Sequence, residues 1–243
     1  NVVLISPAST SPKLSNAGKY FFRTVPSDIR QGDYAADLIY NKGYSTLAVL
    51  YTNDEYGEGF KDVIVESFGV KGGEVVATIP YARDETDFSS KIQDIKQTNP
   101  DAIYIVNNAP ASAVAALEEI DNQGLESALF GSEGLKNEQV AGSGGGEGLI
   151  ITAVTSGTEE FLNKHQEEYG EPGPFAAQAY DAFMVIAEAI KNGATTGEEI
   201  RQELLNLELN GATGTVKFQS SGDVFGKYDL YQVEDSKFVK TDG

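Results

Sequence analysis

Between Thr46 and Ala153, short apolar runs alternate with amphipathic stretches of helical length. In the stretch Glu55–Phe68, for example, Phe60, Ile64 and Phe68 recur at the spacing of one helical face. The predicted strands of this segment are Leu47–Tyr51, Glu74–Ile79, Ala102–Val106, Ala128–Gly131 and Leu149–Ala153, and the predicted helices are Glu55–Phe68, Asp87–Gln97 and Pro110–Gln123. Strands separated by helices form right-handed βαβ units, which build a parallel sheet with helices on both faces. The segment therefore predicts one α/β domain of about five strands.

The segments before Thr46 and after Thr155 show a different pattern of predicted elements. Before Thr46, the β-branched run Val2–Ile5 predicts a fully buried strand, Tyr20–Val25 predicts a second strand, and Ser27 or Asp28 is placed to cap a helix that begins near Ile29. After Thr155 the pattern is mainly helical, and Ser143–Gly148 just before it predicts a flexible loop. The predicted elements here are helices Glu159–Tyr169, Phe175–Asn192 and Gly197–Leu207, then strands Gly214–Phe218, Lys227–Val233 and Lys237–Val239. The apolar face of the second of these helices is predicted to comprise Phe175, Ala179, Phe183, Ala187 and Ile190.

The charge balance excludes several classes of partner. The 243 residues include 37 Asp and Glu against 18 Lys and Arg, a formal net charge of −19. Such a chain repels phosphate backbones and anionic membranes, so we expect no nucleic-acid partner. No cysteine is present, which excludes thiol nucleophiles, disulfides and Cys-based metal sites. No apolar run approaches the ~20 residues that span a bilayer, and because the chain opens inside a predicted strand, we expect that a segment upstream of Asn1 has been removed.

Candidate ligand-binding residues follow from the predicted topology. In open parallel sheets, ligands bind beyond the carboxyl ends of the strands. These ends carry Tyr56, the amides Asn107 and Asn108, and Glu133 within a Gly-Ser-Glu-Gly turn. Together with the hydroxyls of Ser9 and Thr10, they would form a recognition set in which a partly desolvated Glu133 favours a cationic group. The alternative is that Glu133 is an exposed acid in a turn and that the 9–11 hydroxyls are ordinary loop residues.

Enzyme motifs are weak in this sequence. Gly57-Glu58-Gly59 lacks the third glycine of a dinucleotide fingerprint, and the SGGGEG segment lacks the Lys-Ser/Thr of a P-loop. Gly131-Ser132-Glu133-Gly134 does not match the G-x-S-x-G nucleophile turn. The single histidine, His165, lies in a charged helix and is predicted to face solvent. Three acidic pairs are predicted to be solvated surface: Asp54-Glu55, Asp84-Glu85 and Glu118-Glu119. We therefore predict neither catalysis nor a cofactor nor a metal site.

Five segments, in order along nearly the whole chain, resemble one known family. They are ISPAST with KLS after it, YFFRTVPSD with RQG, DEYGEG, FGSEGL and AAQAYDA. The chain resembles the type I periplasmic binding proteins of ABC importers, in the branched-chain amino acid class. The resemblance implies two α/β lobes joined by three crossovers, with parallel sheets flanked by helices. It assigns residues 1–28 and 156–226 to an incomplete first lobe, and residues 29–155 and 227–243 to the second, with hinge strands near 25–28, 153–156 and 225–228.

The same resemblance implies roles for individual residues. The carbonyl of Ala8 and the hydroxyl of Thr10 would contact the ammonium and carboxylate groups of an amino acid, with Ser9 beside them. Glu133 would pair with the ammonium, and Tyr56 would close over the ligand from the second lobe. Two positions depart from the branched-chain pattern, since Asn108 stands where an aromatic is usual and Ala177 stands near another bulky pocket position. A more polar or larger amino acid therefore fits as well, and Tyr180-Asp181 is expected to have a packing role.

The resemblance also implies partners and a location. These are a small amino acid ligand, the membrane permease of an ABC importer, and a periplasmic or extracellular site, with a membrane anchor upstream of Asn1 as an option. Dimerisation through the incomplete lobe is a further option, because an exposed sheet edge invites pairing. Two other functions stay open at this point: a ligand-sensing domain of a receptor or regulator with the same fold, and a hydrolase that uses Asp and Glu.

Overall fold

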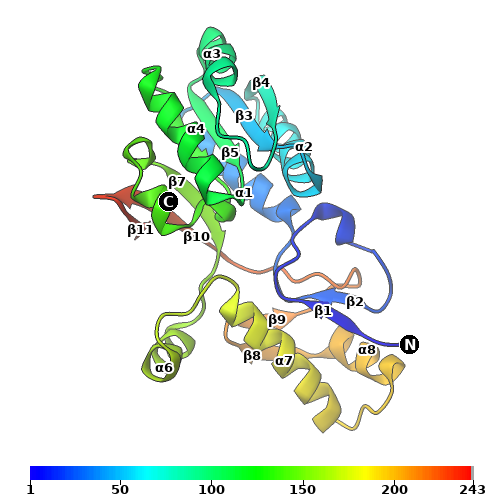
Figure 1. Ribbon diagram of the computed structural model, residues 1–243. Helices are drawn as coiled ribbons and strands as arrows, with labels where there is room; N and C mark the ends of the chain where they lie inside the picture. Colours follow the sequence, from blue (N-terminus) through cyan, green and yellow to red (C-terminus); the bar gives the residue numbers. More distant parts are fainter. Residues whose placement is uncertain (242–243) are drawn as a thin grey trace. The chain divides into compact units, whose positions relative to one another are not determined.

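The chain folds into two compact units in the computed structural model, which describes residues 1–241. Unit 1 comprises Asn1–Arg30 and Val154–Tyr228. Unit 2 comprises Gln31–Ala153 and the segment from Asp229 onward. The backbone therefore passes from one unit to the other three times, after Arg30, after Ala153 and after Tyr228 (Figure 1).

Unit 2 contains a mixed sheet in which β3, β4, β5, β6 and β7 form parallel pairs. The strand order in the described residues is β11-β10-β7-β6-β5-β3-β4. Its strands are β3 (Thr46–Thr52), β4 (Glu74–Tyr81), β5 (Ala102–Val106), β6 (Ala128–Gly131), β7 (Ile150–Val154), β10 (Tyr228–Glu234) and β11 (Lys237–Thr241). The predicted parallel α/β arrangement is confirmed. The expectation of about five strands was too low because β10 and the antiparallel β11, from the chain's end, join the same sheet.

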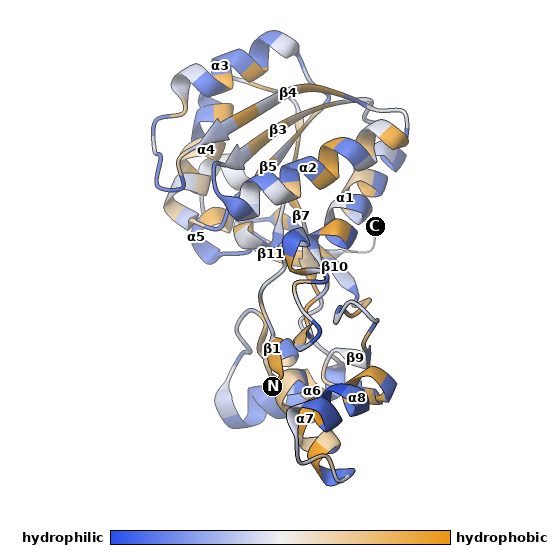
Figure 2. Cartoon of the chain, turned by 90° about the vertical axis from the view of Figure 1, so that its right-hand side faces the viewer, coloured by the Kyte–Doolittle hydropathy of each residue, from blue (hydrophilic) through white to orange (hydrophobic). Residues whose placement is uncertain are grey.

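The helices of unit 2 cover both faces of this sheet. They are α1 (Asp28–Asn41), α2 (Glu55–Val70), α3 (Ser89–Thr98), α4 (Pro110–Asn122) and α5 (Glu138–Ala141). Helix α2 shows why they form: Asp54 caps it by accepting a hydrogen bond from the Gly57 N–H at 2.9 Å, and Phe60, Ile64 and Phe68 are buried along one face. Figure 2 shows the resulting mixture of hydrophilic and hydrophobic positions on these helices.

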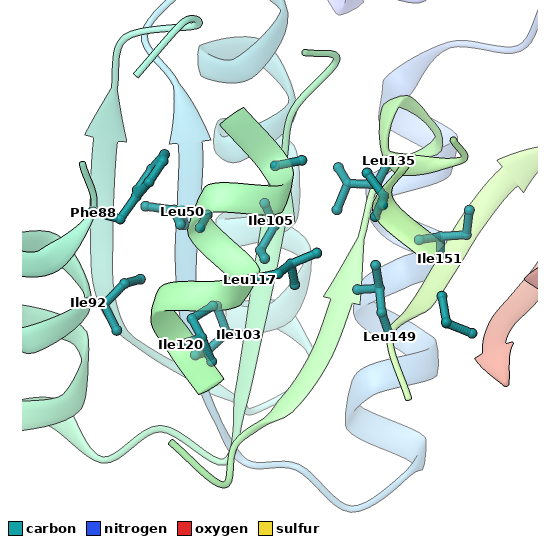
Figure 3. Packing of buried hydrophobic residues seen from close by; sticks show 14 of the residues in the cluster. Leu50, Phe88, Ile92, Ile103, Ile105, Leu117, Ile120, Leu135, Leu149 and Ile151 are labelled. Carbon is teal, nitrogen blue, oxygen red and sulfur yellow. The ribbon is translucent and has the colours of Figure 1, made fainter. Parts of the chain in front are cut away.

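Strand β5 divides the core of unit 2 between the two faces. Ile103 and Ile105 pack against Leu117 and Ile120 of α4 on one face (Figure 3). The intervening Tyr104 packs on the other face in a cluster with residues of α1 and α2. Side chains alternate across a strand, so a continuous apolar run requires cover on both sides. The run AIYIV therefore specifies a central strand of a covered sheet.

Unit 1 contains two small sheets and three further helices. The sheets are the parallel pair β1 (Leu4–Ser6) and β2 (Phe21–Arg23) and the antiparallel hairpin β8 (Glu208–Gly211) and β9 (Gly214–Lys217). The helices are α6 (Glu159–Tyr169), α7 (Ala176–Lys191) and α8 (Gly197–Asn206). Their core is a cluster made by Phe22, Val185, Leu204, Val216, Phe218 and Val224. Strand β8 had no counterpart in the sequence prediction.

Two apolar stretches of unit 1 are more exposed than predicted. Val2 is 84% exposed and Leu4 is 63% exposed, so the predicted fully buried strand is wrong for the described residues. The reason is that β1 pairs with β2 alone within the described part of the chain. On α7 the predicted inward face is also wrong, because Phe183 is 71% exposed and Ile190 is 55% exposed.

The buried face of α7 comprises Ala177, Val185 and Ala189 together with two polar side chains, Gln178 and Asp181. Asp181 is fully buried and accepts hydrogen bonds from the backbone N–H groups of Ala212 (2.6 Å) and Thr213 (2.9 Å). It therefore fixes the turn between β8 and β9, which a helix-period pattern of apolar residues does not reveal. The packing role expected for Tyr180-Asp181 is in this way a hydrogen-bonding role of Asp181.

The glycine-rich segment Ser143–Gly148 contains a short helical turn that packs against α4, so the prediction of a flexible loop is wrong. Gly144–Gly146 form a short 3-10 turn in which Gly145 and Gly146 are buried. A Cβ on Gly145 would lie 2.2 Å from the carbonyl oxygen of Leu117 in α4. Glycine is required there because the turn and the helix backbone are in direct contact.

Candidate functional site

The loop after β1 carries the first group of predicted ligand-binding residues. The Oγ of Ser6 accepts hydrogen bonds from the backbone N–H groups of Ser9 at 3.0 Å and of Ala8 at 3.4 Å. Ala8 and Ser9 are exposed, whereas Thr10 is 6% exposed. The loop therefore presents two accessible residues above a nearly buried hydroxyl, all within unit 1.

Arg23 of β2 holds this loop in place. Its guanidinium is fully buried and donates from Nη1 to the carbonyl oxygens of Ser9 (3.1 Å) and Ser11 (2.9 Å), and from Nη2 to Oγ of Ser15 (2.8 Å). Its Nε forms an ion pair with Asp223 at 2.6 Å. A planar guanidinium with several donors in a fixed fork suits this role. No motif in the sequence pointed to Arg23, although an arginine in the apolar run Phe21-Phe22-Arg23-Thr24-Val25 was the available signal.

Asp28, the first residue of α1, lies beside Thr10. Its backbone N–H donates to the Thr10 carbonyl oxygen at 2.9 Å, and its side chain is fully buried. Burial raises the pKa of this carboxyl to about 7, against smaller lowering effects of the Thr10 hydroxyl and the Arg23 charge. Neither carboxyl oxygen receives a hydrogen bond of good geometry from the described residues. The sequence predicted Ser27 or Asp28 as the helix cap, and in the structure the Ser27 hydroxyl accepts a hydrogen bond from the Ile29 N–H at 3.3 Å.

Unit 2 carries the second group at the carboxyl ends of three neighbouring strands. Tyr56 follows β3, Asn108 follows β5 and Glu133 follows β6, and these strands are adjacent in the sheet order. Adjacent strands lie about 4.8 Å apart, so the three residues share one edge of the sheet. The topological expectation for these three residues thus agrees with their places in unit 2.

Two glycines bring the connecting segments close to the strand ends. A Cβ on Gly57 would lie 2.0 Å from the carbonyl oxygen of Thr52, and a Cβ on Gly134 would lie 2.0 Å from that of Asn107. Glycine at these positions lets α2 and the Glu133 turn begin directly against β3 and β5. Tyr56 and Glu133 are therefore held by backbone contacts, not by long loops.

The three residues differ in exposure. Asn108 is exposed, whereas the Tyr56 hydroxyl and the Oε2 atom of Glu133 are buried. The Tyr56 ring also packs edge-on against Phe60, with centroids 6.2 Å apart. Asn107, the second predicted amide, is fully buried, and its Oδ1 accepts a hydrogen bond from the Ala109 N–H. Asn107 is therefore a structural residue of the β5 end, and Asn108 is the accessible amide.

The other residues considered in the sequence have structural surroundings. His165 is half-buried between Phe161 and Tyr169, so its predicted solvent-facing position is wrong, and its Nδ1 lies 2.8 Å from the carbonyl oxygen of Gly170. In the acidic pairs, Asp54 caps α2 and Glu85 pairs with Lys91, so these two carboxylates are not merely solvated. Among the described residues, no group of three or more His, Cys, Asp or Glu side chains is placed to hold a metal ion.

Comparison with known proteins places this fold in a family. A family model described as periplasmic binding protein matches residues 1–237. The chain belongs to the periplasmic binding protein family. The family is one of solute-binding proteins rather than enzymes. Within residues 1–241, no helix of this periplasmic binding protein has the length and apolar content needed to cross a membrane.

Three relatives illustrate the similarity. The leucine-, isoleucine-, valine-, threonine- and alanine-binding protein of Pseudomonas aeruginosa is 26% identical over 92% of this chain and 62% of its own length. A leucine binding protein from Thermotoga maritima has a TM-score of 0.89 at 25% identity, covering 99% of this chain and 72% of that one. An ABC transporter substrate-binding protein from Desulfitobacterium hafniense, solved with Leu, has a TM-score of 0.83 at 26% identity, covering 98% and 73%. This periplasmic binding protein spans just under two thirds of the length of its first curated relatives.

Proposed function

We propose that this chain is the ligand-binding part of an extracytoplasmic solute-binding protein that captures a small amino acid and delivers it to the permease of an ABC importer. The two units correspond to the two lobes of the family fold. The relatives support the amino acid class, since their names refer to leucine, isoleucine, valine, threonine and alanine.

The observation that carries the proposal is the placement of Glu133. Its turn is fixed against the end of β5 by Gly134, and one carboxyl oxygen is buried, so the Glu133 side chain is held in place at the strand-end edge of unit 2, where ligands bind in such sheets. A small ligand's ammonium group is its natural partner. Asn108 and Tyr56, on the neighbouring strand ends, supply further polar contacts to the same ligand.

The loop of unit 1 supplies the complementary groups. The carbonyl of Ala8, the exposed Ser9 and the hydroxyl of Thr10 offer acceptors and donors for the ammonium and carboxylate groups of a zwitterion. Because Arg23 fixes this loop, the loop loses little conformational entropy on binding.

The test is a binding measurement with a matched pair of variants. The purified protein is screened by thermal shift against the L-amino acids, and isothermal titration calorimetry then gives the affinity for each that raises the melting temperature. Glu133→Ala should weaken binding by about 2–5 kcal/mol, as expected for removal of one half of a buried charge pair. Glu138→Ala, which removes an exposed carboxylate five positions along, should bind like the wild type. Wild-type affinity in the Glu133 variant would refute the assignment.

A further inference from the structure

The hydroxyl of Thr10 can donate one hydrogen bond, and two acceptors compete for it. In the proposed function, on which this inference rests, one acceptor is the carboxylate of the bound amino acid. The other is the buried carboxyl of Asp28, which the Thr10 hydroxyl faces. An ionised carboxylate can only accept hydrogen bonds, so when Asp28 is ionised the Thr10 hydroxyl donates its proton to Asp28. A protonated Asp28 carboxyl can instead donate to Thr10 Oγ1, which leaves the Thr10 proton available for the ligand.

We propose that Asp28 is a positioning residue that sets the direction of the Thr10 hydrogen bond, so that capture of a ligand carboxylate is coupled to protonation of Asp28. No bond is made or broken in this step apart from transfer of one proton from solvent to the Asp28 carboxyl. The protonated carboxyl donates to Thr10 Oγ1, and the Thr10 hydroxyl donates to the ligand.

Three observations of unit 1 support this assignment. First, the backbone N–H of Asp28 donates to the Thr10 carbonyl oxygen at 2.9 Å, which fixes the two residues beside each other. Second, the carboxyl is fully buried, and neither of its oxygens receives a well-formed hydrogen bond from the described residues. An ionised group in such a place is costly, so a proton is the simplest way to satisfy it. Third, burial raises the pKa of Asp28 to about 7, which permits both protonation states near neutral pH.

The charged and titratable groups around Asp28 leave its carboxyl able to gain or lose a proton. Arg23 of β2 is the cation that acts on the carboxyl, and its charge is already engaged by Asp223 at 2.6 Å. Tyr228 donates its hydroxyl to the Ser27 carbonyl oxygen at 3.2 Å. On the same helix, Arg30 is exposed and lies over the Phe225 ring, 4.0 Å from its centroid. Each of these three side chains therefore has a partner other than the Asp28 carboxyl.

The coupling predicts a specific pH profile for binding. With a pKa near 7, Asp28 is about 90% protonated at pH 6 and about 10% protonated at pH 8. If the protonated form binds, the affinity for L-leucine falls about tenfold from pH 6 to pH 8. Leucine keeps its carboxylate and ammonium charges across this range, so the ligand itself contributes no such change.

The experiment is calorimetry of L-leucine with the wild type, Asp28→Asn and Thr10→Val at pH 6, 7 and 8. We expect the amide introduced by Asp28→Asn to donate to Thr10 permanently, so that this variant binds at every pH as tightly as the wild type does at pH 6. In Thr10→Val the affinity should be lower and independent of pH. Repeating the wild-type titration at pH 8 in two buffers of different ionisation enthalpy should show uptake of nearly one proton per leucine. A residue that served only to hold the fold would instead weaken binding when mutated and leave the pH profile unchanged.

The outcomes separate this inference from the proposed function. If leucine binds with the same affinity at pH 6 and pH 8 and without proton uptake, the inference is wrong and the proposed function stands. If leucine, isoleucine, valine, threonine and alanine all fail to bind at any pH, the proposed function is wrong for this amino acid class. In that event, carboxyl ¹³C NMR of the ligand-free protein still measures the proton on Asp28, and a midpoint below pH 5 would overturn the inference by itself.

Discussion

The Nε atom of Arg23 lies 2.6 Å from Oδ1 of Asp223, although the two residues are 200 positions apart in the chain. This ion pair is buried on the arginine side and joins β2 to the segment that precedes β10. The same guanidinium holds the 9–15 loop through three further hydrogen bonds. Arg23 therefore links the stability of unit 1 directly to the shape of the proposed ligand loop.

Breaking this pair should be costly. We expect Asp223→Asn to reduce the free energy of unfolding by about 3–5 kcal/mol, because it leaves the buried guanidinium without its counter-charge. Urea denaturation followed by circular dichroism measures the change. The matched control is Glu160→Gln, which breaks the pair with Lys164 between side chains that are 78% and 72% exposed, and should cost less than about 1 kcal/mol. Equal effects of the two variants would contradict the role given to Arg23.

Gly134 should also be sensitive to substitution, for a steric reason. A Cβ at this position would lie 2.0 Å from the Asn107 carbonyl oxygen, so Gly134→Ala must push the Glu133 turn away from β5. We expect a loss of about 1–3 kcal/mol in the free energy of unfolding, together with weaker amino acid binding as Glu133 shifts. Gly144→Ala is the control, since a Cβ there meets nothing within 4 Å and should change stability by less than about 1 kcal/mol. Calorimetry and urea denaturation on both variants test this pair.

The sequence was sufficient for strands β3 to β7 of unit 2 and for helices α2, α3 and α4 because their signals are local. The run AIYIV and the spacing of Phe60, Ile64 and Phe68 each specify an element without reference to the rest of the chain. The strand-end rule then predicts Tyr56, Asn108 and Glu133 on one edge of the sheet, because it needs only the order of the strands.

Unit 1 was harder to predict because its determining contacts are long-range. The partner of Arg23 lies 200 residues away, and the buried face of α7 includes Asp181, whose hydrogen-bond partner Ala212 lies 31 positions further along the chain. Burial of Asp28 likewise depends on how the loop, β2 and α1 meet, and a helix-capping pattern cannot show it. Residues whose role depends on a distant partner are therefore the ones that sequence reasoning missed.

The core beneath α4 gives a test of the packing. Leu117 is fully buried between α4 and the face of the sheet that carries Ile103 and Ile105 (Figure 3). Leu117→Ala should lower the free energy of unfolding by about 2–5 kcal/mol through lost burial and a residual cavity. Val70→Ala, at an 82% exposed position at the end of α2, should lie within about 0.5 kcal/mol of the wild type. A loss below about 1 kcal/mol at Leu117 in urea denaturation would show that this face is packed more loosely than described.

Stability should fall as the pH rises from about 4 to about 7 because of Asp28. Burial raises its pKa to about 7 in the folded state, whereas an unfolded aspartate has a pKa of about 3.9. Between these values the folded protein retains a proton that the unfolded chain has released, so the free energy of unfolding decreases with increasing pH across this window. The full effect is on the order of 4 kcal/mol as an upper bound, at about 1.4 kcal/mol per pKa unit.

Asp28→Asn removes the titration and should be stabilised relative to the wild type at pH 8 but not at pH 4. The difference in urea midpoints between the two proteins, measured at pH 4, 6 and 8, isolates the contribution of Asp28, because the other carboxylates are the same in both. Asp121→Asn, which removes an exposed carboxylate, should show no such pH-dependent difference. If the curves for the wild type and Asp28→Asn stay parallel across this range, Asp28 is ionised throughout in the folded protein.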